Sequence, residues 1–325
     1  MTTSIDLNNL SIWTFTPDGT GSGAWKDVLP SGSMAFGSIN RPEQVFQASG
    51  ADSAWVLGGF DKYDTPNQYP YLPSMVHFNM SSRTITNISN PAYLTANGAV
   101  DNGEMHYVPS FGPQGIFIAM GGDTIQHIPG LISFETVAVF DPAKQEWFNQ
   151  TTTGSPPRPR LEFCTAGINS TNGTYEMYVE KHLRSSCATT VFNRTNLPPR
   201  FVYGGWGTQL GAQAVQFDSI NILTLPAFHW ISIPNNPQNP RIGLTCNAVG
   251  GSQILTIGGR DGNPKVVDST HILNTQSSYD TKDPNAQGLA IFDLTNLTFS
   301  AQYTAGAPAY EQSSLVQQFY SAAQQ

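Results

Sequence analysis

The side chains that could carry out chemistry are few and scattered in this sequence. It contains no HxH or HExxH spacing that would place two imidazoles on one metal ion, and no GxSxG, P-loop or CxxC motif. The six histidines lie at positions 77, 106, 127, 182, 229 and 271. Paired aspartates in the stretches 61–67 and 280–285 lack the ligand spacing of an EF-hand, and turn formation explains them better. We therefore expect no catalytic residue, no metal and no cofactor.

The three cysteines are the remaining reactive side chains, namely Cys164, Cys187 and Cys246. An odd number is awkward for a secreted protein, in which cysteines normally pair. Cys164 and Cys246 each follow a Pro-Arg pair by a similar offset. Whether these two can meet depends on the elements that carry them, and those elements repeat along the chain.

The clearest repeat is a predicted strand that ends in a glycine pair. The four copies are AWVLGG, IFIAMGG, RFVYGG and ILTIGG, which end at Gly59, Gly122, Gly205 and Gly259. The spacings between them are 63, 83 and 54 residues. Each pair is followed, after a loop, by a predicted β-hairpin, and a fifth hairpin at 12–25 precedes the first pair. The last strand of each hairpin carries one large apolar residue, in order Trp25, Ile85, Trp147, Trp230 and Phe299.

A β-propeller explains this pattern. Glycine after a buried strand allows a sharp turn and a close approach of neighbouring backbones, and the large apolar residue can pack between adjacent sheets. Four short strands cannot bury both faces alone, but stacking such units around an axis buries them. The composition also favours an all-β fold, because only 12% of the residues are charged and 11% are aromatic. The alternative is an ordinary β-sandwich with glycine-rich turns.

The ordered set of motifs resembles kelch-repeat proteins, and in particular the fungal kelch proteins that are secreted or anchored at the membrane or cell wall. The resemblance rests on IWTFTPDGTGSGAW (12–25), PRLEFCTAG (159–167), SINILTLPAFHWISI (219–233), PRIGLTCNAVGGSQILTIGG (240–259) and QGLAIFDLTNLTF (287–299). It implies a kelch-type β-propeller of the galactose oxidase/kelch fold. We expect four full four-stranded blades plus an N-terminal hairpin, which is an incomplete ring.

The expected domain is a single propeller over residues 1–325. It comprises a partial blade at 1–26, blades at 36–87, 93–149, 161–232 and 243–302, an insertion at 178–200 and a tail at 303–325. The tail is expected to form a strand or a short helix. Kelch rings usually hold about six or seven blades, so the chain resembles a propeller without its leading blades and signal peptide. Because the inner strands of successive blades converge on the axis, Cys164 and Cys246 are disulfide candidates.

The insertion at 178–200 is inferred from the long spacing of 83 residues, which falls to 60 when this segment is removed. The rejoined sequence GTYEMFVYGG restores a single strand. The codons of residues 177–179 can contain the splice donor GTATGT, those of 195–196 the branch point ACTAAC, and those of 199–200 a CAG acceptor. We interpret the segment as a retained intron that packs poorly, with FVYGG as the blade strand. The alternative is a genuine surface loop.

The expected ligand-binding face carries the long loops that follow the second strand of each blade. Its candidate residues are Phe60, Tyr63, Asp123, Trp206, Arg260 and Asp261. Aromatic side chains with a few charges suit a protein loop or a cell-wall carbohydrate, although each aromatic could instead anchor its own loop. The function favoured is a non-catalytic interaction module at the fungal cell surface. The alternative is a carbohydrate-active propeller enzyme of the oxidase or mutarotase type, but neither Cys164 nor Cys246 has the tyrosine and histidine set of a copper oxidase.

The charge pattern narrows the possible partners. The formal net charge is −8 and no basic cluster stands out, so we expect neither nucleic acid nor an anionic membrane as a partner. No apolar run reaches the length of a membrane span, and the N-terminus does not resemble a secretory signal. The resemblance nevertheless implies an extracellular or cell-surface glycoprotein. The candidate glycosylation sites are the sequons at Asn79, Asn87, Asn149, Asn169, Asn172 and Asn296.

Overall fold

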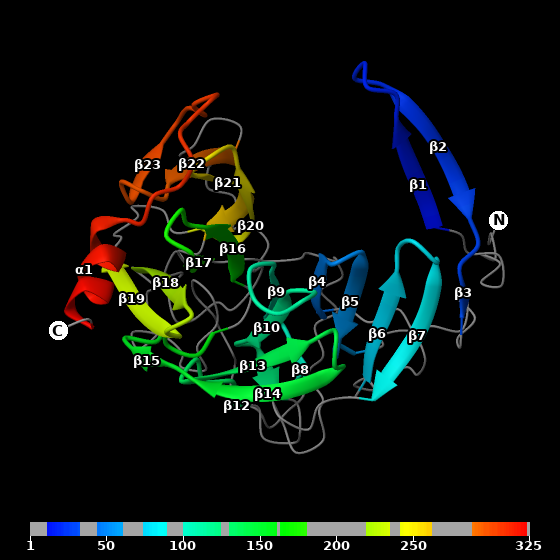
Figure 1. Cartoon of the computed structure of the whole chain (residues 1–325), viewed down its shortest axis with the longest axis horizontal. Coiled ribbons are helices and arrows are strands. Elements are labelled where there is room, and N and C mark those ends of the chain that lie inside the picture. Colours follow the sequence, from blue (N-terminus) through cyan, green and yellow to red (C-terminus); the bar gives the residue numbers. More distant parts are fainter. Residues whose placement is uncertain are drawn as a thin grey trace, which may run out of the picture.

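The computed structural model describes residues 12–32, 44–60, 74–89, 100–124, 130–160, 163–180, 219–234, 241–261 and 288–323. These residues form short β-strands and one short helix, so the fold is all-β, as the sequence predicted. The sheets follow one another around an arc. The arc is open between β23 (Thr298–Ser300) and the hairpin formed by β1 (Ile12–Pro17) and β2 (Gly23–Val28) (Figure 1).

Four of the sheets share one plan, in which four antiparallel strands pair side by side in chain order, and we call them blades 1 to 4. Blade 1 consists of β4 (Phe46–Gly50), β5 (Ser53–Leu57), β6 (Ser74–Asn79) and β7 (Thr84–Ser89). Blade 2 consists of β9 (Glu104–Val108), β10 (Ile116–Met120), β13 (Thr136–Asp141) and β14 (Glu146–Thr151). Blade 3 consists of β16 (Cys164–Asn169), β17 (Tyr175–Glu180), β18 (Ser219–Leu225) and β19 (His229–Pro234). Blade 4 consists of β20 (Arg241–Val249), β21 (Gln253–Asp261), β22 (Leu289–Asp293) and β23.

A short connecting strand extends two blades in the same way. β3 (Ser31–Gly32) follows the hairpin β1–β2 and pairs in parallel with β7, and β15 (Thr153–Gly154) follows the hairpin β13–β14 and pairs in parallel with β19. Gly32 and Gly154 both have positive φ, and a Cβ there would meet the backbone oxygens of Ile85 and Trp230, respectively. The hairpin β1–β2 therefore stands in the same relation to blade 1 as the outer hairpin of blade 2 does to blade 3.

The first two glycine pairs join each blade to the next one. Gly59, with φ 82°, donates its N–H to the carbonyl oxygen of Val100 at 2.7 Å. Gly122, with φ 86°, donates in the same way to Arg160 at 3.0 Å. Val100 belongs to β8 (Val100–Asp101), which also pairs with β11 (Asp123–Thr124), and β11 pairs in turn with β12 (Gly130–Leu131). The glycines thus allow the close backbone approach that the repeat predicted.

Apolar side chains fill the spaces between neighbouring blades. Trp147 of blade 2 stacks obliquely on Phe140 and joins a buried cluster that includes Trp55 of blade 1. Trp230 of blade 3 packs edge-on against Phe134 and donates its indole N–H to the Phe134 carbonyl oxygen at 3.2 Å. Both tryptophans therefore face the preceding blade, as expected for a residue that seals two sheets together.

The predicted start of the insertion at residue 178 is wrong, because the second strand of blade 3 extends past it. β17 continues to Glu180, and its Tyr178 and Val179 pair with Ala166 and Thr165 of β16. Tyr178 and Val179 are 2% and 0% exposed, so they belong to the blade and the predicted insertion cannot begin at residue 178. The physical reason is that this segment already alternates in the required way and directly follows the turn from β16. Residues 181–218, with the predicted strand FVYGG and Cys187, lie outside the described residues.

The tail forms a short helix, α1 (Ser314–Ala322), that packs on blade 3. Val316 is buried in the cluster between blades 3 and 4. Phe319 stacks on His229 with ring centroids 3.9 Å apart, and the Tyr320 hydroxyl lies 3.0 Å from the Thr224 hydroxyl. The sequence predicted either a strand or a short helix for this segment. Tertiary contacts with blade 3 stabilise the helix, which would be too short to persist alone.

A buried carboxyl group lies under this tail. Glu176 is fully buried, and its Oε1 accepts hydrogen bonds from the hydroxyls of Thr174 at 2.6 Å and Thr224 at 3.2 Å. Gln312 of the tail donates to the Thr174 hydroxyl at 2.8 Å, and the hydroxyls of Tyr178 and Tyr310 lie 3.2 Å apart. Burial raises the pKa of Glu176, which makes its neutral form easier to retain.

Candidate functional site

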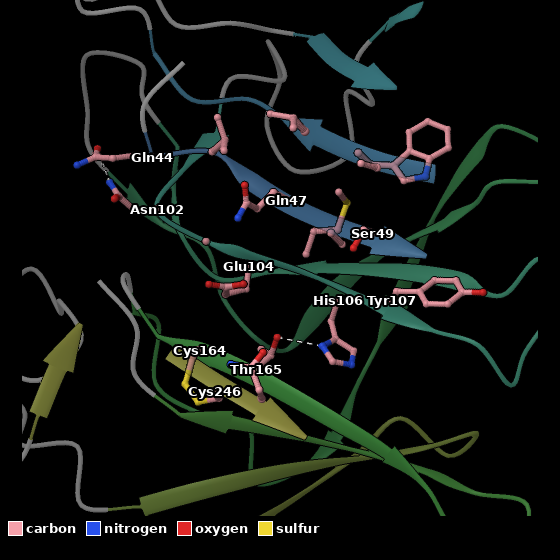
Figure 2. A pocket seen from close by; sticks show the side chains of 18 of the residues that line it. Gln44, Gln47, Ser49, Asn102, Glu104, His106, Tyr107, Cys164, Thr165 and Cys246 are labelled. Atoms are coloured by element: carbon pink, nitrogen blue, oxygen red, sulfur yellow. Dashed lines mark hydrogen bonds between the residues drawn. A yellow bond between two sulfur atoms is a disulfide. The ribbon is translucent and has the colours of Figure 1, made fainter. Parts of the chain in front are cut away.

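The innermost strands of the four blades surround a cavity of about 610 Å³ near the axis of the arc. β4 lies beside β9, β9 beside β16, and β16 beside β20. The polar side chains in its wall come from these strands and the residues just before them (Figure 2). They include Gln44, Gln47, Ser49, Asn102, Glu104, His106, Thr165 and Asn247. Amides and hydroxyls prevail, so the cavity can both donate and accept hydrogen bonds while carrying little charge.

Gln44 and Asn102 form a cross-link between blades 1 and 2 at one end of this cavity. The backbone N–H of Asn102 donates to the Gln44 carbonyl oxygen, and the Asn102 side-chain amide donates to Gln44 Oε1, both at 2.8 Å. Both residues have left-handed backbone conformations, with φ 58° for Gln44 and 54° for Asn102. Such conformations cost about 1–2 kcal/mol in a residue other than glycine and persist only where surrounding contacts impose them. The amide pair is therefore held in a fixed orientation.

His106 links blade 2 to blade 3 in the cavity wall. Its Nδ1 lies 3.1 Å from the Thr165 hydroxyl, and its Nε2 lies 2.8 Å from the Tyr175 hydroxyl. Burial lowers the pKa of His106 to about 4, so the ring is neutral at physiological pH. With both ring nitrogens occupied, His106 positions its neighbours rather than acting as a poised base. No motif around His106 distinguishes it from the other five histidines.

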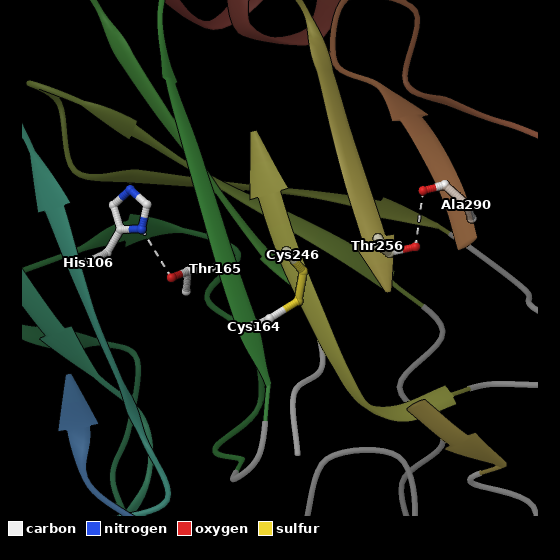
Figure 3. Close-up of a disulfide and its surroundings, with 6 residues drawn as sticks. All are labelled: His106, Cys164, Thr165, Cys246, Thr256 and Ala290. Atoms are coloured by element: carbon white, nitrogen blue, oxygen red, sulfur yellow. Dashed lines mark hydrogen bonds between the residues drawn. A yellow bond between two sulfur atoms is a disulfide. The ribbon is translucent and has the colours of Figure 1, made fainter. Parts of the chain in front are cut away.

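A disulfide bond between Cys164 and Cys246 joins β16 to β20 beside the cavity (Figure 3). The Cα atoms are 5.7 Å apart, which lies within the normal range for a disulfide. Both side chains are buried. The structure thus brings together the two cysteines that the repeat placed on adjacent inner strands. In the part of the chain that is described, no three His, Cys, Asp or Glu side chains gather closely enough to hold a metal ion.

The structure describes four of the six residues expected on the ligand-binding face. Phe60 follows β5, whose end lies beside the start of β4, so this residue is at the same end of the cavity as Gln44. Asp123 pairs with Asp101, next to Asn102, and accepts a hydrogen bond from the Gly130 N–H at 2.9 Å.

Arg260 and Asp261 belong to β21, where they pair with Ile242 and Arg241 of β20. Tyr63 and Trp206 lie outside the described residues. Sequence reasoning selected none of the cavity residues Gln44, Gln47 and Asn102, because single amides near strand starts follow no recognisable motif.

The candidate glycosylation sites fall on strand ends, turns and outer strands. Asn87, Asn149, Asn169, Asn172 and Asn296 are exposed, and Asn79 is half-buried. Three of the six side chains contact protein. Asn79 accepts from the Ser82 N–H at 2.8 Å, Asn172 donates to Gln312 at 3.1 Å, and Asn169 accepts from the Ser110 hydroxyl.

Comparisons with known proteins agree with this architecture. No family model matches the chain. A kelch repeat-containing protein from Arthroderma benhamiae is 28% identical over 207 residues, which are 63% of this chain and 25% of that protein. Among solved structures, that of YjhT aligns with a TM-score of 0.51 at 11% identity, and the alignment covers 77% of this chain and 66% of the YjhT chain. The fold is that of a kelch-type β-propeller.

Kelch-type blades account for the repeats, and the matched region is only a quarter of the length of the curated relative. The described part of this kelch-type chain contains no helix long and apolar enough to cross a membrane.

Proposed function

We propose that the chain is a non-catalytic kelch-repeat interaction module that binds its ligand at the end of the axial cavity marked by Gln44 and Asn102. The observation that carries this proposal is the cavity of about 610 Å³, lined by amides and hydroxyls from four inner strands. The fixed amide pair at its end leaves further donor and acceptor positions available, because each amide group can make several hydrogen bonds. A rigid polar cavity with few charges selects a neutral polar ligand.

The ligand proposed is a carbohydrate. Sugar hydroxyls donate and accept hydrogen bonds, and so do the side chains of Gln47, Asn102 and Thr165 in the cavity wall. Tyr107, which is half-buried, adds aromatic surface to the same wall, which suits the apolar face of a sugar ring. The cell surface is the proposed location, because the Cys164–Cys246 disulfide favours an oxidising compartment and five of the six candidate sequons have an exposed asparagine.

The test is a glycan array of neutral and acidic oligosaccharides, probed with the whole chain. Gln47→Leu should abolish binding because it removes an amide from the cavity wall at similar size. Gln150→Leu, on the outer strand β14, is the matched control and should bind like the unmodified chain. Binding of no glycan, or equal binding by both variants, would show that the ligand is not a carbohydrate in this cavity; binding to a peptide library would then indicate a protein loop.

The alternative function is a carbohydrate-active enzyme of the oxidase or mutarotase type. The feature that could support it is His106, which lies in the cavity wall with Tyr175 as a neighbour. Any glycan that binds should therefore be incubated with the protein while peroxide release and anomer exchange are followed. We expect neither, because both nitrogens of the neutral His106 ring already have partners.

A further inference from the structure

The hairpin β1–β2 presents an uncovered aromatic face. Phe15 lies opposite Trp25 in the antiparallel register, and Trp13 precedes Phe15 by two residues, so all three side chains share one face. Their exposed fractions are 63% for Trp13, 46% for Phe15 and 65% for Trp25. Three aromatic side chains on one small sheet face form an apolar patch of the kind that marks an interaction site.

The same aromatic pair occurs in blade 2, where it is covered. Phe140 lies opposite Trp147 between β13 and β14, as Phe15 lies opposite Trp25. The ring centroids are 5.0 Å apart in both pairs, and both pairs are tilted. In blade 2, however, Phe140 is 0% and Trp147 7% exposed. The cover is blade 1, which contributes Trp55, Leu57 and Met75 to the same buried cluster.

Blade 4 presents the other half of such an interface. Ile257 lies opposite Leu289, immediately before the glycine pair, as Leu57 lies opposite Met75 in blade 1. Leu57 and Met75 are fully buried by blade 2, whereas Ile257 is 41% and Leu289 37% exposed. Blade 4 therefore carries the apolar pair that receives the next blade, and the hairpin carries the aromatic pair that packs on a preceding blade.

The distribution of exposed apolar side chains supports this assignment. Among the described residues, the large exposed ones gather at the two ends of the arc, and only Met80 and Phe148 lie elsewhere. The ends face the same opening in Figure 1 but belong to sheets separated across it. The two faces do not cover each other within one chain.

We propose that the aromatic face of the hairpin in one copy (Trp13, Phe15 and Trp25) packs on the Ile257–Leu289 face of blade 4 in a second copy. The contact repeats the interface between blades 1 and 2, with the same pairs in the same roles. It is a head-to-tail contact, so each copy keeps one free hairpin and one free blade face. Association can therefore continue beyond two copies unless the arc closes.

Light scattering coupled to size exclusion, over a wide range of concentrations, tests the proposal with the whole chain. The hairpin variant combines Phe15→Ser with Trp25→Ser, and the face variant combines Ile257→Thr with Leu289→Thr. Phe148→Ser is the control, because Phe148 is a 44% exposed aromatic on the outer strand of blade 2, away from both ends. Circular dichroism and a thermal melt confirm that each variant is folded, which is expected because the changed side chains are exposed.

The unmodified chain and the Phe148→Ser control should form dimers and larger species in a concentration-dependent manner. The hairpin variant and the face variant should each be monomeric alone. Their equimolar mixture should form a dimer that grows no further, because one intact hairpin meets one intact face. A monomeric unmodified chain, as ring closure within one copy would give, overturns the proposal. So does self-association that persists in either variant, or a mixture that stays monomeric.

Discussion

Removing the Cys164–Cys246 disulfide should destabilise the propeller by a measurable amount. The bond closes a loop of 82 residues between the inner strands of blades 3 and 4. The loop-closure entropy that such a cross-link removes from the unfolded chain corresponds to about 4.5 kcal/mol at 25 °C. For a chain of 325 residues, the unfolding entropy near the midpoint is on the order of 0.7 kcal/mol per kelvin. Tm should therefore fall by roughly 7 °C.

The assay is a thermal melt of the double variant Cys164→Ala with Cys246→Ala. Alanine is the suitable replacement because both cysteines are buried, and serine would add a hydroxyl without a partner. The unmodified chain in the presence of a reductant should melt at the same temperature as the double variant. Cys187→Ala is the matched control and should leave Tm and its response to reductant unchanged. A fall in Tm of less than about 2 °C, either in the double variant or when reductant is added to the unmodified chain, would refute the loop-closure reasoning.

Three further outcomes are expected. Because burial raises the pKa of Glu176, the folded chain binds that proton more tightly than the unfolded chain, so the free energy of unfolding should fall as the pH rises above the ordinary carboxyl pKa. Urea unfolding at several pH values should show this slope, and Glu176→Gln should remove it. Gly122→Ala should cost at least about 2 kcal/mol more than Gly173→Ala in the same assay, because only its Cβ would meet a backbone oxygen, that of Asp101, at 2.4 Å. A chain that lacks residues 178–200 loses the buried Tyr178 and Val179 of β17 and should melt below the full chain; a melting temperature no lower than that of the full chain would support the retained-intron interpretation.

The arrangement of strands in blades could be predicted because it depends on the spacing of glycine pairs and hairpins, which can be read directly in the sequence. The contact between neighbouring blades requires both a glycine pair at the end of a buried strand and a large apolar residue on the outer hairpin. Gly59 and Gly122 bond to the chain that enters the next blade, and Trp147 packs on the preceding one. These requirements concern backbone geometry and side-chain volume, so they produce a pattern that can be recognised in a single sequence.

The second strand of blade 3 was predicted with the wrong end because two segments carry the same alternation. YEMYV and FVYGG both suit a buried strand, and periodicity alone does not say which one pairs with β16. The structure pairs residues 175–180, where the Tyr178 hydroxyl also reaches the Leu294 carbonyl oxygen at 3.2 Å. Such a contact between residues more than a hundred positions apart leaves no local signal.

The cavity was not predictable for a related reason. Gln44 and Asn102 are 58 residues apart, and the sequence around neither forms a motif. Their meeting depends on how two successive blades turn about the axis, which in turn depends on packing between Trp55 and Phe140. Asp123 pairs with Asp101, next to Asn102, but the expected binding face did not include the amides that line the cavity.

Strand position separates the two proposed interactions. Inner strands carry polar side chains toward the axis, whereas the hairpin β1–β2 and the middle strands β21 and β22 of blade 4 carry the apolar faces that another blade would cover. Gln47 lies on the innermost strand of blade 1 and Trp25 on the outer hairpin β1–β2, so their substitutions should act independently. If Trp25→Ser with Phe15→Ser abolished association but left glycan binding intact, the axial cavity would be complete within one copy. If both were lost together, the cavity would need the second copy to bind its ligand.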